Sequence, residues 1–167
     1  IMWFLLAASV SPALEGQQLP KTEGETLSGP KVVLPDAAAG KVALLIFGFS
    51  KSSQKPTEAF GKRIQTDFAQ HSGFTYYEMP VLEDVPRLIR GMVIGSMKRK
   101  VPAEIQPHFA VVLQNEKELK KLVNYKESDD AYLLVLGRDG NIAWQSHGAF
   151  SDNLYTEVKN HVQSLMQ

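Results

Sequence analysis

The sequence predicts an α/β protein, in which helices flank a central mixed β-sheet and the chain ends in a β-hairpin plus a helix. Residues 41–48 form an almost unbroken apolar run, which is typical of a central strand covered on both faces. Residues 52–71 space their large apolar side chains four apart, as an amphipathic helix does. Residues 137–140 read Gly-Arg-Asp-Gly between two apolar runs, and Asp-Gly at that place favours a hairpin turn.

The other elements follow from the same two periodicities. Short strands are expected over residues 31–34, 74–82, 108–113, 131–136 and 141–144, and further helices over residues 85–98, 116–123 and 152–166. Strands and helices alternate first, and a hairpin and a helix follow. This order predicts a mixed sheet between layers of helix.

Composition divides the chain into three parts. Residues 31–167 are predicted to form one domain, and the polar residues 14–30 to form a linker or a loosely held arm. Residues 1–13 join a short apolar run to the small residues Ser11-Pro12-Ala13, and so resemble the end of a secretory signal peptide. The alternative is that these residues pack against the domain or a neighbouring molecule. The signal-peptide interpretation predicts an exported protein, periplasmic or secreted, with membrane association as one form of that location.

Composition also excludes several classes of function. The 18 basic and 18 acidic side chains balance, which argues against broad electrostatic capture of nucleic acid. The chain has no cysteine, so disulfides, iron–sulfur clusters, thiolate metal sites and thiol nucleophiles are excluded. The histidines are scattered over different elements, at positions His71, His108, His147 and His161. No pair has the short spacing of a metal site, so no metal or cofactor is expected. The alternative is that folding gathers two of them with Asp129 or Asp130.

Four short segments stand out together: Val33-Leu34-Pro35-Asp36, Gly40-Lys41, the apolar strand that follows, and the hairpin segment Arg138-Asp139-Gly140-Asn141-Ile142. Their combination resembles the thioredoxin superfamily, in particular its branch of extracytoplasmic TlpA-type proteins and peroxiredoxins. The resemblance covers residues 31–167 and implies a thioredoxin-like fold. It places Ser52 and Lys55 where the family has its two redox cysteines, and Ala131 where the family has a cis-proline. The resemblance therefore implies a redox-inactive protein, because neither serine nor lysine forms a mixed disulfide or a sulfenic acid.

A second set of segments begins after Met97: the basic segment 98–104, the strand start at 108–112, the segment 130–136 and the Ile-Ala-Trp of the hairpin. In these segments the chain is similar to the thioredoxin-fold assembly factor of mitochondrial ATP synthase. Ala131 replaces a glycine of that family. This second resemblance implies a non-enzymatic binding or assembly factor for a partner polypeptide, such as a subunit of a membrane complex. It also implies an alternative location at the mitochondrial inner membrane.

The helix expected over residues 85–98 and its basic end are the best candidates for binding. This stretch carries an aliphatic, Met-containing stripe and two glycines four residues apart. Such a helix can dock a partner helix, lie on an anionic membrane surface, or pack on the core with a solvated basic end. The complete set of candidate partner-binding residues is Phe49, Lys51, Arg87, Arg90, Lys98, Arg99, Lys100, Asp130 and Tyr132.

The start of the helix at Ser52 and Lys55 supports a second hypothesis. In it, the Lys55 amine activates Ser52, or the free backbone N–H groups bind a small anion. The ordinary interpretation is that a nearby serine caps the helix and Lys55 is solvated. The sequence contains no glycine-rich phosphate loop, Ser-His-Asp signature or paired-carboxylate motif. The first hypothesis is therefore a non-enzymatic partner-binding protein, and the alternative is a small-ligand-binding protein or a thiol-independent enzyme.

Overall fold

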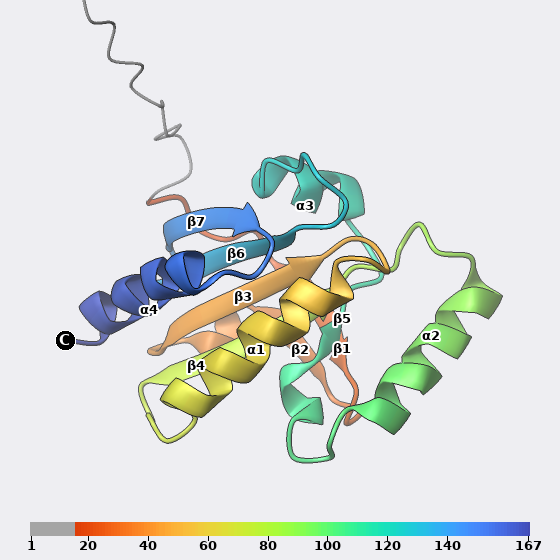
Figure 1. Cartoon of the computed structure of the whole chain (residues 1–167), viewed down its shortest axis with the longest axis horizontal. Coiled ribbons are helices and arrows are strands. Elements are labelled where there is room, and N and C mark those ends of the chain that lie inside the picture. Colours follow the sequence, from red (N-terminus) through yellow and green to blue (C-terminus); the bar gives the residue numbers. More distant parts are fainter. Residues whose placement is uncertain (1–15) are drawn as a thin grey trace, which may run out of the picture.

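The computed structural model describes residues 16–167, which form two sheets and four α-helices (Figure 1). The larger sheet has the strand order β4-β3-β6-β7, and the smaller has the order β2-β1-β5. The strands are β1 (Thr22–Thr26), β2 (Lys31–Leu34), β3 (Val42–Gly48), β4 (Phe74–Pro80), β5 (Ala110–Val111), β6 (Ala131–Leu136) and β7 (Ile142–Gly148). The α-helices are α1 (Gln54–Phe68), α2 (Arg87–Lys100), α3 (Glu116–Leu122) and α4 (Asp152–Met166). β3 is parallel to β4 and antiparallel to β6, so the predicted mixed sheet is confirmed.

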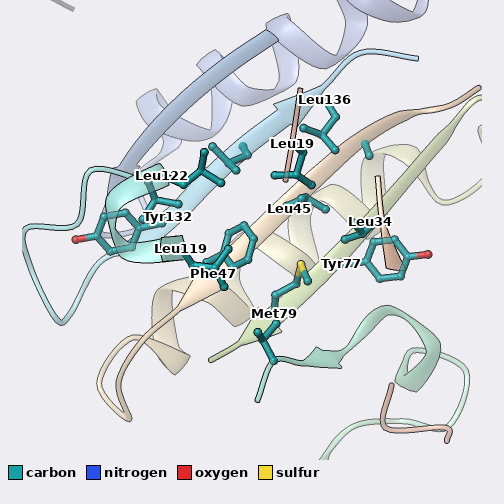
Figure 2. Packing of buried hydrophobic residues seen from close by; sticks show 14 of the residues in the cluster. Leu19, Leu34, Leu45, Phe47, Tyr77, Met79, Leu119, Leu122, Tyr132 and Leu136 are labelled. Carbon is teal, nitrogen blue, oxygen red and sulfur yellow. The ribbon is translucent and has the colours of Figure 1, made fainter. Parts of the chain in front are cut away.

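Strand β3 runs through the middle of the core, and its side chains alternate between two apolar layers. Val42, Leu44 and Ile46 face the layer that α1 and α4 cover. Leu45 and Phe47 face the opposite layer, where they meet β2, α3 and the segment around Leu19 (Figure 2). All seven residues of β3 are buried, which is why the sequence shows a continuous apolar run instead of an alternating one.

Helices α1 and α4 cover one face of the larger sheet (Figure 1). Ser151 caps α4, because its hydroxyl accepts a hydrogen bond from the Leu154 N–H at 3.1 Å. The two helices are joined by Tyr155, whose hydroxyl donates to the Asp67 carboxylate at 2.7 Å. This bond, followed by the charge of Lys159, lowers the pKa of Asp67 against the opposing effect of its own burial.

We expect Tyr155→Phe to lower the free energy of unfolding by about 1 kcal/mol, the usual net contribution of one hydrogen bond. The loss should be largest near neutral pH and should fade in acid. The pKa of Asp67 is lowered in the folded state, so its contribution is present above the ordinary carboxyl range and is lost as the pH falls. Urea denaturation at several pH values measures both effects. A loss that is equal at all pH values would contradict the assignment to Asp67.

The structure corrects the sequence prediction at the N-terminal end of the described chain. Residues 14–30 were expected to be a linker or loose arm, but Thr22–Thr26 forms β1, which pairs with both β2 and β5. Leu19 and Leu27 flank this strand and are 2% and 3% exposed, so from Leu19 onward the segment belongs to the domain. The expected signal-peptide remnant at residues 1–13 lies outside the described residues.

Other boundaries differ by a few residues. The strand expected over 108–113 is reduced to β5, and β7 continues to Gly148, beyond the expected end at residue 144. The helix expected over 85–98 begins after Pro86 and ends at Lys100. The hairpin turn is as predicted: Gly140 has φ of +80°, and its N–H donates to the Gly137 carbonyl at 3.0 Å. None of the helices among residues 16–167 is both long and apolar enough to cross a membrane.

Candidate functional site

Ser52 and Lys55 lie at the beginning of α1, as expected, and both are exposed. The Ser52 hydroxyl donates to the Asp129 carboxylate at 2.5 Å, and the Ser50 hydroxyl donates to the Ser128 carbonyl at 2.5 Å. These two bonds tie the loop before α1 to the loop before β6. Ser53 occupies the cap position of α1, but its hydroxyl donates to the Ser50 carbonyl at 2.7 Å and leaves the helix amides without a side-chain cap.

This arrangement is poorly suited to activate Ser52 as a nucleophile. The hydrogen bonds from Ser52 and then Ser128 lower the pKa of Asp129, and a carboxylate with a lowered pKa is a weak base. Within residues 16–167, no hydrogen bond joins Ser52 to Lys55 or to any histidine. The contacts at this helix start hold two loops together and show no catalytic geometry.

Ala131 is the first residue of β6, in register with Gly148 of β7. Beside it, the Asp130 carboxylate lies 2.7 Å from Nδ1 of His147, whose ring stacks on Tyr132 at a centroid distance of 5.3 Å. Tyr132 is fully buried, and its hydroxyl bonds to the backbone of residues 126 and 127. Tyr132 was expected to bind a partner, but burial leaves it no surface to offer, so it acts in the core.

Phe49 also belongs to this packed region. Its ring lies edge-on to Tyr125 and Tyr132 at centroid distances of 5.4 and 5.6 Å. The Lys120 ammonium lies 4.9 Å from the ring centre of Tyr125 and 2.7 Å from the buried Glu116 carboxylate. Phe49 is therefore half-buried among aromatic rings, whereas its expected companion Lys51 is exposed.

Helix α2 differs from the other three α-helices because none of its residues is fully buried. It stands at the side of the molecule, apart from α1 and α4 (Figure 1). One side of it packs through Val93, Ile94 and Met97 on a small apolar cluster that contains Leu82 and Phe109. The opposite side exposes large apolar side chains: Leu88 is 88% exposed, Ile89 51% and Met92 73%. We call Leu88, Ile89 and Met92 the apolar face of α2.

Basic residues occupy both ends of α2 but differ in their contacts. Arg90 is half-buried and donates to the carbonyls of Glu83 and Val85 at 2.7 and 3.3 Å, so it fastens the amino end of the helix. Arg87 is exposed, as are the three residues of the last turn, Lys98, Arg99 and Lys100. Among residues 16–167, no carboxylate lies within ion-pair distance of that last turn. The sequence also allowed this helix to pack on the core. The structure confirms that packing for the side of α2 that contacts the small apolar cluster, and not for the opposite, exposed side.

The histidines do not form a metal site within residues 16–167, where no group of three potential ligands is gathered. Each of them packs against an aromatic ring of a different element, one at the end of α1 and three on strands of the larger sheet. His71 lies against Phe68, His108 against Tyr76, His147 against Tyr132 and His161 against Trp144.

Comparison with known proteins finds matches among solved structures only. No protein-family model matches the chain, and no curated protein does. A putative thiol:disulfide interchange protein DsbE from Chlorobium tepidum superimposes with a TM-score of 0.65 at 17% identity, covering 92% of this chain and 98% of that one. The thioredoxin domain of a thiol-disulfide oxidoreductase from Bacteroides vulgatus gives 0.59 at 23% identity, covering 89% and 97%. A SCO1/SenC family lipoprotein from Bacillus anthracis gives 0.60 at 9% identity, covering 91% and 96%.

The chain has a thioredoxin-like fold without cysteine. This confirms the thioredoxin-like expectation, and at such identities the likeness shows the fold alone. Two of these solved structures are named for thiol–disulfide exchange, which requires a thiol, and this chain has none. The similarity to the ATP synthase assembly factor stays a prediction.

The structure brings Phe49, Ser52, Asp130 and Tyr132 together through the two tied loops, and it places the basic residues of α2 on a separate element. Sequence reasoning singled out the apolar stripe of this helix but did not count the three residues of the apolar face of α2 among the candidate partner-binding residues. A signal was present, since the apolar residues from Leu88 to Met97 span roughly 240° of the helix circumference at 100° per residue. One supporting core cannot cover such a wide sector.

Proposed function

We propose that this protein is a redox-inactive, non-enzymatic binding or assembly factor that holds a partner polypeptide through α2. The observation that carries the proposal is the apolar face of α2, where three large apolar side chains are half or more exposed next to one another. Exposed apolar clusters with a polar rim are characteristic of interaction surfaces. A helix that presents such a face favours a polypeptide partner, which can pack against it as a helix does in a groove.

The absence of cysteine from a thioredoxin-like fold supports this proposal. Without cysteines, the position of the family's redox site offers two hydrogen-bonded loops and no thiol nucleophile. A location outside the cytoplasm is part of the proposal, supported by structural relatives named as lipoproteins from Streptococcus pneumoniae and Bacillus anthracis. A subunit of a membrane complex is a partner consistent with that location.

The test is cross-linked affinity capture from detergent-solubilised membranes, followed by mass spectrometry. In the test variant, Leu88, Ile89 and Met92 are replaced by glutamine, which keeps a good helix former at each exposed position. A second variant replaces Lys98, Arg99 and Lys100 by alanine. The matched control replaces Glu157, Asn160 and Gln163, exposed on α4, by alanine.

We expect a membrane-complex subunit to be enriched by the wild type and the α4 control, and to be lost from the apolar-face variant. A smaller loss is expected from the basic variant, because exposed charges contribute little to binding affinity. Equal recovery from all four proteins, or recovery of nothing beyond background, would contradict the proposal. Measurable thiol–disulfide cycling by the purified chain would contradict its non-enzymatic part.

A further inference from the structure

The chain has no cysteine, so its oxidisable sulfur is confined to methionine. The methionines among the described residues lie in very different surroundings. Met79 is fully buried on β4, and Met97 and Met166 pack against apolar clusters. Met92 belongs to the apolar face of α2 and is 73% exposed. Of these four thioethers, that of Met92 is the one open to a reagent in solution.

The neighbours of Met92 along the helix leave its thioether uncovered. Helical side chains lean toward the amino end, so a residue is covered by the residues three and four positions after it. For Met92 these are Gly95, which has no side chain, and Ser96, which has a small one. Among the residues that the structure describes, a Cβ on Gly95 would meet only the Arg99 guanidinium, at 3.5 Å. An oxidant therefore reaches the Met92 sulfur without any rearrangement of the backbone.

Oxidation at this position changes the chemistry of the proposed binding surface. Leu88 and Ile89 lie four and three positions before Met92, on the same side of α2, and both are exposed. A sulfoxide converts the apolar thioether between them and Gly95 into a polar group. The sulfoxide oxygen requires a hydrogen-bond donor, which an apolar partner surface does not offer. Burying it there costs as much as burying any other unpaired polar group.

We propose that Met92 is an oxidation site: a hydroperoxide converts it to the sulfoxide, and the oxidised face no longer holds the partner polypeptide. The inference rests on the proposed function, because it concerns the regulation of the same contact. In the reaction, the sulfur lone pair attacks one oxygen of hydrogen peroxide, an S–O bond forms and the O–O bond breaks. The departing hydroxide takes up the proton of the transferred oxygen and leaves as water. The sulfur is oxidised by one electron pair, and the peroxide is reduced by the same pair.

Oxidation of Met92 leaves the packing of α2 intact. The helix rests on its small apolar cluster through Val93, Ile94 and Met97, and Met92 is not a member of that cluster. The sulfoxide is therefore compatible with the folded chain. It also stays exposed to methionine sulfoxide reductases, which return each sulfoxide epimer to the thioether. The modification is thus reversible.

The test treats the purified full chain with hydrogen peroxide and follows each methionine by peptide mass spectrometry. We expect Met92 to gain oxygen before Met79, Met97 and Met166. The same protein is then used at a series of concentrations for capture from detergent-solubilised membranes. Oxidised wild type should hold the partner about tenfold more weakly than untreated wild type, as expected for one unpaired buried polar group. Methionine sulfoxide reductases should restore capture, and Met92→Gln should weaken it without any oxidant.

Two leucine variants assign the effect to one sulfur. Met92→Leu removes the sulfur and keeps an apolar side chain, so its capture should be the same before and after peroxide. Met97→Leu should respond to peroxide as the wild type does.

Equal capture by oxidised and untreated wild type would overturn the inference alone. So would a loss of capture by peroxide-treated Met92→Leu, or the oxidation of Met79, Met97 or Met166 before Met92. No capture by the untreated wild type would overturn the proposed function, and the inference with it.

Discussion

Replacing Gly61 with alanine is expected to lower the free energy of unfolding by about 3 kcal/mol, although alanine is the better helix former. Gly61 lies in α1 directly above the buried side chain of Glu78 on β4. A Cβ at this position would lie 2.5 Å from the Glu78 Cδ and within 2.7 Å of both carboxylate oxygens. Glu78 is 4% exposed, so its carboxyl group has little space into which to move.

The matched control is Gly91→Ala on α2, where nothing lies within 4 Å of the new methyl group. There the same substitution should stabilise the protein by up to about 1 kcal/mol. A double-mutant cycle identifies the cause. In a Glu78→Ala background the clash is gone, so Gly61→Ala should cost little or become favourable. An equal loss in both backgrounds, measured by urea denaturation, would show that Glu78 is not responsible.

Glu78→Gln is expected to stabilise the protein by about 1–3 kcal/mol near neutral pH, because the unfolded chain ionises Glu78 there and folding into the buried site must restore its proton. Burial, and then the charge of Glu58, raises the pKa of the Glu78 carboxyl well above its usual range. Its Oε1 has no hydrogen-bond partner, and neither does the nearby Tyr76 hydroxyl. Glutamine keeps the shape of the side chain but never ionises.

The pH dependence has a definite sign. The folded state holds the Glu78 proton to a higher pH than the unfolded state does, so the stability it contributes is complete below the ordinary carboxyl pKa. That contribution is lost as the pH rises toward the folded-state pKa. Melting temperatures from about pH 4 to about pH 8 should therefore coincide for the two proteins in acid and diverge as the pH rises. A constant difference across this range would contradict a titrating Glu78.

The central elements could be predicted from the sequence because local pattern and tertiary environment agree there. The apolar run at 42–48 is typical of a strand covered on both faces, and β3 is buried along its whole length. The Asp139-Gly140 turn specifies its own hairpin through the backbone conformation of glycine. Strand β1 could not be predicted in this way, because its sequence Thr-Glu-Gly-Glu-Thr is polar and its burial depends on pairing with β2 and β5.

In the candidate site, too, the positions of some residues could be predicted from the sequence, whereas their long-range contacts could not. Ser52, Lys55 and Ala131 could be placed from sequence because they sit at fixed points of a recognisable order of elements. The hydrogen bond from Ser52 to Asp129 joins residues 77 positions apart, and no local pattern indicates it. The burial of Tyr132 likewise depends on rings contributed by Phe49, Tyr125 and His147.

The sequence by itself determined that this chain has no thiol to react, because folding cannot supply a side chain that the sequence lacks. It also determined the α/β class, because the spacing of apolar residues along each segment indicates whether that segment is a helix or a strand. Only the tertiary structure decided which side of α2 stays uncovered and which carboxyl group is buried without a partner. Both depend on how much neighbouring surface the rest of the chain brings to a residue, and periodicity along one element does not contain that information.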